Sequence, residues 1–139
     1  MGMNDGFLAS WQTQLLGVLR IVTAYIFLLH GSAKILHVPH VAMFDNLPLL
    51  SMIGIAGILE LVGGILMLIG LFTRATAFVL SGEMAAAYFI GHASKGGVLL
   101  PLLNDGDAAV LYCFVFLYFA AAGPGAWAVD NARAKATAR

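Results

Sequence analysis

The chain has 139 residues, of which 61% are hydrophobic and 10% are charged, and its mean hydropathy is +0.93. Soluble domains carry roughly a quarter charged residues, so this composition excludes an ordinary soluble domain, and it is equally unlike a disordered chain. Seven Lys and Arg residues balance seven Asp and Glu residues, which removes the electrostatic basis for a nucleic-acid partner. We therefore expect an all-α integral membrane protein surrounded by the lipid bilayer.

Long apolar segments predict the elements. A helix needs about 20 mostly apolar residues to cross a bilayer. Four segments meet this requirement, at about 11–36, 51–72, 73–92 and 107–122. They predict an integral membrane four-helix bundle, built of two antiparallel helical hairpins and forming a single domain over 1–139. The first segment contains Arg20 and is too long for a cleavable signal peptide, so we expect it to stay as an anchor.

Helix ends carry their own signals. Thr73 and Asp107 are candidate N-caps, because their side-chain oxygens can accept backbone N–H groups. Gly123, with Pro124 and Gly125 after it, is expected to end the last helix. The polar tail 130–139 is expected to be a disordered, positively charged anchor.

The connections predict an orientation. Four crossings place the loops 37–50 and 93–106 on one side of the membrane and both termini on the other. The terminal side carries Arg74, Arg133, Lys135 and Arg139, whereas the loop side carries Lys34 and Lys95. By the positive-inside rule, we expect a multi-pass protein of a bacterial-type inner membrane with both termini in the cytoplasm.

Ionisable residues within the first two segments suggest a site. Residues at spacings of three and four form one stripe on the first segment: Arg20, Thr23, Phe27, His30 and Lys34. Glu60 lies among glycines, which let another helix approach closely. A rise of about 1.5 Å per residue places Glu60 roughly 13 Å, His30 roughly 9 Å and Lys34 roughly 3 Å below the loop-side surface. We expect a Glu60–His30 contact, with Lys34 reaching it from the rim.

The later segments add further candidates. Glu83 lies near mid-membrane at a depth that Arg20 can match, which predicts an Arg20–Glu83 pair. His92 follows nine residues later, about half a turn around the helix, so it should not share a face with Glu83. Asp107, Phe114 and Tyr118 share one helical face, which suggests an acidic mouth above two aromatic rings.

Each candidate has a structural alternative. The Arg20–Glu83 and Lys34–Glu60 pairs could fix helix register alone. His30 could make an ordinary interhelical hydrogen bond. Phe114 and Tyr118 could be core residues, Asp107 a cap, and Cys113 a packing residue.

Several kinds of site lack a sequence signal. His37 and His40 resemble a metal pair only in their spacing, so we expect no metal site. The sequence has no recognisable haem, flavin, iron–sulfur or phosphate-loop motif and no cysteine pair.

Three motifs resemble the DoxX family of small four-helix membrane proteins. The first is Arg20 followed by the run from Phe27 to Lys34. The second runs from Gly57 to Leu66 and on to Arg74. The third is Gly106-Asp107-Ala108-Ala109, followed by Gly123-Pro124-Gly125 and Asp130. The resemblance covers about Leu15 to Asp130, and it implies a subunit or partner of membrane-associated redox enzymes.

Three functions remain open. The first is a quinone-reactive or redox-linked subunit of a membrane oxidoreductase assembly, with a membrane quinone as its cofactor. Glu60 and His30 would relay protons. The expected quinone-binding residues are Arg20, Lys34, Glu83, Asp107 and Tyr118.

The second function is a non-catalytic scaffold, whose two longer loops bind a protein partner. The third is a small-solute transporter, because intramembrane charges also mark transport paths. Four spans would then require a homo-oligomer.

Overall fold

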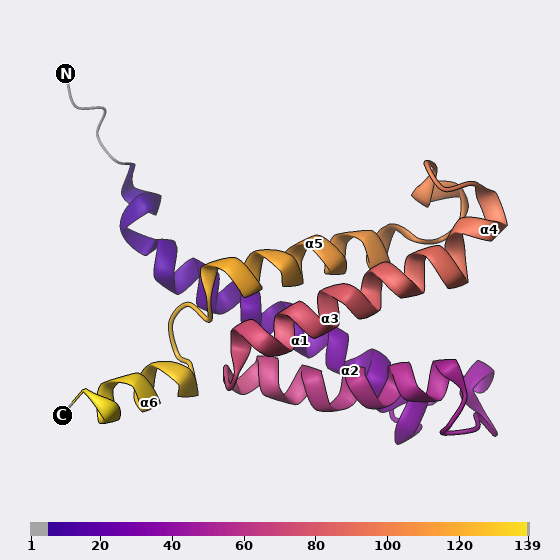
Figure 1. Ribbon diagram of the computed structural model, residues 1–139, viewed down its shortest axis with the longest axis horizontal. Coiled ribbons are helices and arrows are strands. Elements are labelled where there is room, and N and C mark those ends of the chain that lie inside the picture. The colour runs from indigo at the N-terminus through magenta and orange to yellow at the C-terminus, as the bar shows by residue number, and fades with distance from the viewer. Residues whose placement is uncertain (1–5, 139) are drawn as a thin grey trace.

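The computed structural model describes residues 6–138 of the chain, and every regular element in that range is helical (Figure 1). Arg139, which the charge count uses, lies outside the described residues. The elements are η1 Phe7–Trp11, α1 Gln12–Ile35, η2 Ala42–Phe44, α2 Met52–Ile69, α3 Thr73–Ala87, η3 Tyr88–His92, α4 Ala93–Gly96, η4 Pro101–Leu103, α5 Asp107–Ala122 and α6 Val129–Thr137.

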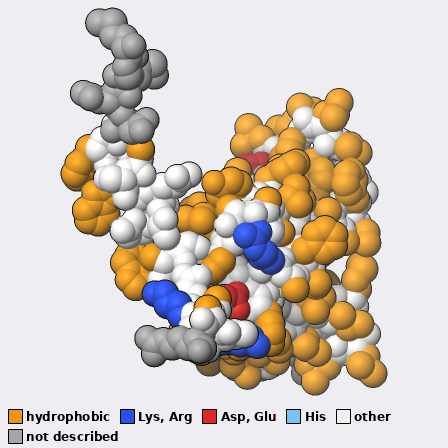
Figure 2. All heavy atoms as spheres, turned by 60° about the vertical axis from the view of Figure 1, so that its left-hand side comes forward, with side chains coloured by type: hydrophobic (Ala, Val, Ile, Leu, Met, Phe, Trp, Pro, Cys, Tyr) orange, Lys and Arg blue, Asp and Glu red, His pale blue; other side chains and the backbone are white. Residues whose placement is uncertain are grey.

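Two elements are long and apolar enough to cross a membrane. They are the continuous helical run Phe7–Ile35 and α2, Met52–Ile69. The helix α5, Asp107–Ala122, is apolar but shorter. Hydrophobic side chains cover most of the face seen in Figure 2, with few charged groups among them. This distribution agrees with an environment of lipid around the helices.

The helices α1 and α2 pack closely along small residues. A Cβ on Gly31 would lie 2.7 Å from the carbonyl carbon of Glu60, and one on Gly64 would lie 3.1 Å from the Cα of Leu28. Side chains larger than hydrogen at Gly31 would therefore force the two backbones apart. This contact positions the C-terminal half of α1 beside Glu60.

A tight turn joins α2 to α3. Gly70 has a φ of 70°, and its N–H donates to the carbonyl of Met67 while that of Leu71 donates to Leu66. These bonds form a Schellman end, which stops α2 and satisfies its last carbonyls. The chain then reverses, and α3 runs back toward the other end of α2.

The second close pair is α3 with α5, and the two lie side by side in Figure 1. Their shared core with α1 and α2 contains Phe27, Met67, Leu80, Phe116 and Phe119, all of them buried. The Phe27 and Phe116 rings meet edge to face at 4.8 Å between centroids. This core thus joins all four helices.

The two ends of the molecule differ in what they contain. One end, here called the terminal end, holds the start of α1, the α2–α3 turn and residues 123–137 (Figure 1). The other, here called the loop end, holds the connections 36–51 and 97–106.

The predicted N-caps at Thr73 and Asp107 and the predicted disordered tail are wrong. Helix α3 begins at Thr73 and α5 at Asp107, so both residues follow the cap position, and neither helix has a side-chain cap from its own N-cap residue. Asp130 instead accepts the N–H groups of Phe72 at 2.9 Å and Thr73 at 2.8 Å. The tail expected to be disordered forms α6, because Asp130 and its neighbours are anchored to the α2–α3 turn.

Candidate functional site

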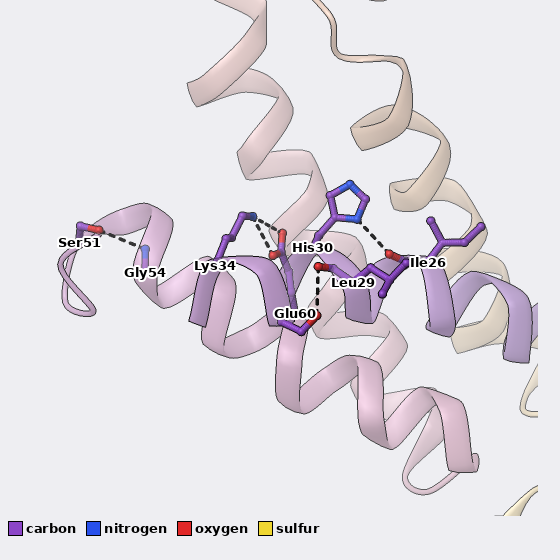
Figure 3. A network of polar contacts seen from close by, with 8 residues as sticks. Ile26, Leu29, His30, Lys34, Ser51, Gly54 and Glu60 are labelled. Atoms are coloured by element: carbon purple, nitrogen blue, oxygen red, sulfur yellow. Dashed lines mark hydrogen bonds and ion pairs between the residues drawn. The ribbon is translucent and has the colours of Figure 1, made fainter. Parts of the chain in front are cut away.

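The loop end contains a buried ion pair between α1 and α2. Lys34 Nζ donates to Glu60 Oε1 at 2.6 Å and to Oε2 at 2.7 Å (Figure 3). Glu60 is buried, and the Lys34 side chain is only 14% exposed. The close approach at Gly31 brings the two helices within reach of this bond. The predicted Lys34–Glu60 contact is therefore formed, and it is bidentate.

The predicted contact between His30 and Glu60 is wrong. His30 Nδ1 donates to the carbonyl of Ile26, one turn back on its own helix, at 3.0 Å (Figure 3). Its ring lies 6.2 Å from that of Tyr112 on α5, between centroids. Correct depth did not produce contact, because His30 points toward α5 while Lys34 occupies both oxygens of Glu60.

A cavity lies between α2 and α3 beside the ion pair; we call it the lateral cavity. It has a volume of about 370 Å³, within the range of small-molecule sites. Apolar side chains form most of its wall, including Ile53, Leu59 and Val79, and its charged lining residues are Lys34, Glu60 and Glu83. The lateral cavity therefore combines a long apolar wall with one charged cluster.

Glu83 is the unusual member of that cluster. Both of its carboxylate oxygens are buried, and within the described range 6–138 neither has a hydrogen-bond partner. A buried polar group without a partner costs roughly 1–3 kcal/mol, and a charged one costs more. Such a group in a cavity wall is typical of a position that a ligand or water completes.

A second cavity, the inner cavity, lies on the other side of the ion pair. Its volume is about 260 Å³, and its wall includes His30, His92, Asp105 and Tyr112 together with Lys34 and Glu60. The ion pair lines both cavities. It consequently stands between an apolar space beside α2 and α3 and a more polar space at the loop end.

The helix changes its winding at the segment that ends in His92, and His92 lines the inner cavity. Residues Tyr88–His92 form a π turn, which delays the residues after it by about 100° relative to a continuous α-helix. His92 Nδ1 then donates to the carbonyl of Asn104 at 3.0 Å. His92 lines the inner cavity and Glu83 lines the lateral cavity, which agrees with the prediction that the two side chains do not share a face.

The predicted Arg20–Glu83 pair is also wrong. The Arg20 guanidinium is fully buried, and all five of its hydrogen bonds in the described chain go to backbone carbonyls. These carbonyls belong to Met67, Leu68, Pro124, Ala126 and Trp127. Met67 and Leu68 lie in the last turn of α2, and the other three residues lie in the connection between α5 and α6. Backbone carbonyls carry partial negative charge, so together they satisfy a cation as a carboxylate would.

The predicted acidic mouth above two rings is not formed as expected. The Phe114 residue is 64% exposed and Tyr118 is 53% exposed, so both point away from the core. Tyr112 and Phe116 take the interior face instead, stacked at 5.8 Å between centroids. The spacing of Tyr112 from Ala109 and Phe116 was the signal for this face. The quinone-binding role predicted for Asp107 and Tyr118 stays a prediction.

Asp130, outside the apolar helices, caps the start of α3. Partial burial would raise the pKa of its carboxyl, but the N–H groups of Thr73 and Phe72 and the charge of Arg133 outweigh it. The pKa of Asp130 therefore lies below its usual value. The sequence reasoning had not assigned this capping role.

Within 6–138, no group of three or more His, Cys, Asp or Glu side chains could hold a metal ion. His40, one half of the His37–His40 spacing, bonds to the exposed Asp45 at 3.0 Å.

Comparison with known proteins gives one family and one relative. The family model described as DoxX matches residues 15–93. A protein of Haemophilus influenzae (strain ATCC 51907 / DSM 11121 / KW20 / Rd), described as an uncharacterized protein, is 47% identical over 132 residues. The match covers 93% of this chain and 96% of that protein. No solved structure matches.

Proposed function

Because this chain belongs to the DoxX family of membrane proteins, we propose that it binds a membrane quinone in the lateral cavity. In this proposal the protein is a quinone-reactive or redox-linked subunit of a membrane oxidoreductase assembly. It is held by the lipid bilayer and by a protein partner or a second copy of itself.

The proposed topology has four spans in a bacterial-type inner membrane. In addition to the two long apolar helices, the continuous run Thr73–Gly96 has the length needed to cross. Helix α5 would complete the bundle with its flanking residues. Arg74 lies at the start of α3, and Arg133 and Lys135 lie in α6, so these cations belong to the terminal end and support cytoplasmic termini.

One observation is the main support for a quinone as the ligand. The lateral cavity has apolar walls and a single charged cluster of Lys34, Glu60 and Glu83. A quinone has the matching chemistry, because it joins an apolar ring and tail to polar ring oxygens. The ring oxygens would lie at the charged cluster, and the tail would extend along Ile53, Leu59 and Val79.

The residues around the ion pair suggest a route for protons. Reduction of a quinone to a quinol takes up two electrons and two protons, the electrons coming from a partner enzyme. Glu60 borders both cavities and is placed to exchange protons with the ring oxygens. His30 and His92 line the inner cavity and would pass protons between Glu60 and the loop end.

Quinone binding in lipid nanodiscs tests this proposal. We expect saturable binding of decylubiquinone to the purified wild-type protein, and weaker binding to Glu60→Gln, which cannot hold Lys34 as an ion pair. Asp45→Asn is the matched control, because it makes the same acid-to-amide change on an exposed loop. Bound quinone would be extracted and quantified from monodisperse samples. Absence of saturable binding to the wild type would contradict the proposal.

A second function is favoured by the surface of the loop end. Leu50 is 89% exposed and Leu99 is 88% exposed, on different loops. Such residues could bind a partner protein on the loop side, as a scaffold requires. Scrambling residues 37–50 and 97–106 should then release a partner that co-purifies with the wild type. Recovery of the same partner from the scrambled protein would contradict the scaffold function.

A further inference from the structure

The connection between α4 and α5 exposes an unusual amount of apolar surface. Residues 97–104 contain no Lys, Arg, Asp or Glu, and we call this segment the apolar loop. Contiguous exposed apolar surface is unfavourable in water and marks a contact with a protein or a membrane. Five side chains of the apolar loop are at least half exposed: Val98, Leu99, Leu100, Leu102 and Leu103.

Three polar side chains satisfy the backbone of the apolar loop from the protein side. Tyr88 Oη donates to the carbonyl of Val98 at 2.6 Å. The buried Asn104 donates through Nδ2 to the carbonyl of Gly97 at 3.0 Å, and its own carbonyl accepts His92 Nδ1 at 3.0 Å. A segment at membrane depth needs internal partners of this kind, because hydrocarbon offers none.

The other connection at the loop end has a different chemistry. In residues 36–51, His40 bonds to Asp45 at 3.0 Å, and both side chains are exposed. An exposed carboxylate is stable in water and costly to move into hydrocarbon. The apolar loop has no group with that requirement, so the two connections suit different surroundings.

The apolar loop is continuous with the outer surface of two helical segments. Val98 and Leu99 share the wall of a groove of about 470 Å³ with Phe89 of η3 and Phe114 of α5. Both phenylalanines are exposed. In Figure 1 the connection, drawn in orange, turns back from α4 toward the start of α5 instead of extending outward beyond the bundle. It therefore lies beside the ends of the helices.

We propose that the apolar loop inserts into the lipid leaflet on the loop side, with its leucine side chains among the upper parts of the acyl chains. The partner of this surface is thus the bilayer itself. Tyr88, His92 and Asn104 hold the loop backbone while the leucines face outward. A protein partner on this side would then bind residues 37–50. The inference does not depend on which ligand the lateral cavity holds.

The depth of a fluorophore in nanodiscs tests the insertion. In a Cys113→Ala background, Leu99→Cys carries an NBD label, and each nanodisc holds one copy of the protein and lipids with nitroxides at known depths. We expect this label to lie about 5–10 Å into the boundary between headgroups and acyl chains, as for other apolar groups that bind at the interface. Asp45→Cys in the same background is the control, and its label should lie in water.

A charge in the apolar loop separates insertion from folding. Leu102→Asp places a carboxylate on the inserted surface, so the label at Leu99 should move outward to the level found at Asp45. Met43→Asp is the matched control, because it adds the same charge at an exposed apolar residue of the other connection. It should leave the Leu99 label at its full depth, and size-exclusion profiles check that each variant is folded.

Three outcomes would overturn the inference. Quenching of the Leu99 label by aqueous iodide as strong as that of the Asp45 label would place the loop in water. Protection from both iodide and the nitroxide lipids would mean that the loop is buried against the chain itself. Full depth in Leu102→Asp would show that the apolar side chains do not determine the position of the loop. Quinone binding is measured separately, so its failure would leave this test unaffected.

Discussion

Arg20 and Glu83 are both charged residues within apolar helices, but the two ends of the molecule treat such groups differently. At the terminal end, the Arg20 guanidinium is fully buried and makes five hydrogen bonds to backbone carbonyls. At the loop end, Glu83 has two buried oxygens without a partner among residues 6–138. The hydrogen bonds of Arg20 hold three chain segments together, whereas the Glu83 oxygens lack hydrogen-bond donors within the described residues.

The two cavities with charged side chains in their walls follow the same division. The lateral and inner cavities both border the Lys34–Glu60 pair near the loop end. At the terminal end, Arg74 donates to the carbonyls of Ala120 and Ala121, so it joins α3 to the end of α5. A charge within the membrane is therefore weak evidence of a site when the backbone satisfies it, and stronger evidence when it borders a cavity unsatisfied.

The largest expected effect comes from removing Arg20. Arg20→Leu would leave several buried carbonyls without donors, each costing roughly 1–3 kcal/mol, so we expect a loss of at least about 3 kcal/mol in unfolding free energy. Thermal unfolding in detergent would show a strongly lowered midpoint. Arg20→Lys, which keeps the charge but loses the planar geometry, should be intermediate. Wild-type stability of Arg20→Leu would contradict the structural role.

Breaking the ion pair should have a similar or smaller effect that a second substitution reverses. Lys34→Met leaves Glu60 buried without its cation and should cost about 3–5 kcal/mol. The double variant Lys34→Met/Glu60→Leu removes both charges, so its stability should return close to the wild-type value.

The same pair of variants separates stability from binding. If the loop end holds a ligand site, the restored double variant should remain unable to bind decylubiquinone in nanodiscs. Full binding by a stable double variant would mean that the charged cluster serves the fold alone, as at the terminal end.

The smallest expected effect concerns Asp130 and depends on pH. Its pKa is lower in the folded protein than in the unfolded chain, so its carboxylate stabilises the fold above about pH 4 and loses this effect as pH falls through the folded pKa. Asp130→Ala should cost about 1 kcal/mol at pH 7, as for loss of a helix cap. Unfolding midpoints at pH 7 and pH 3 measure this, and the difference between variant and wild type should shrink at pH 3.

Part of the candidate site could be predicted from residue spacing. Lys34 and Glu60 were expected near each other because the long Lys34 side chain can reach inward from the rim and the glycines of α2 allow close packing. Similar depth in the membrane did not predict the partners of Arg20 and His30, because neither contacts the carboxylate that was expected for it. A depth along the helix axis fixes height but not direction around the axis, and a long side chain can turn toward whichever acceptors are nearest.

The sequence by itself determined the helical class and the approximate bounds of the apolar helices, because apolar length and the glycines near helix ends are local properties. The tertiary structure decided which charges meet. It placed α2 and residues 124–127 around Arg20, set Asp130 at the start of α3, and brought His92 to the carbonyl of Asn104. Partners of this kind come from segments far apart in the chain, and their choice depends on packing that local spacing does not encode.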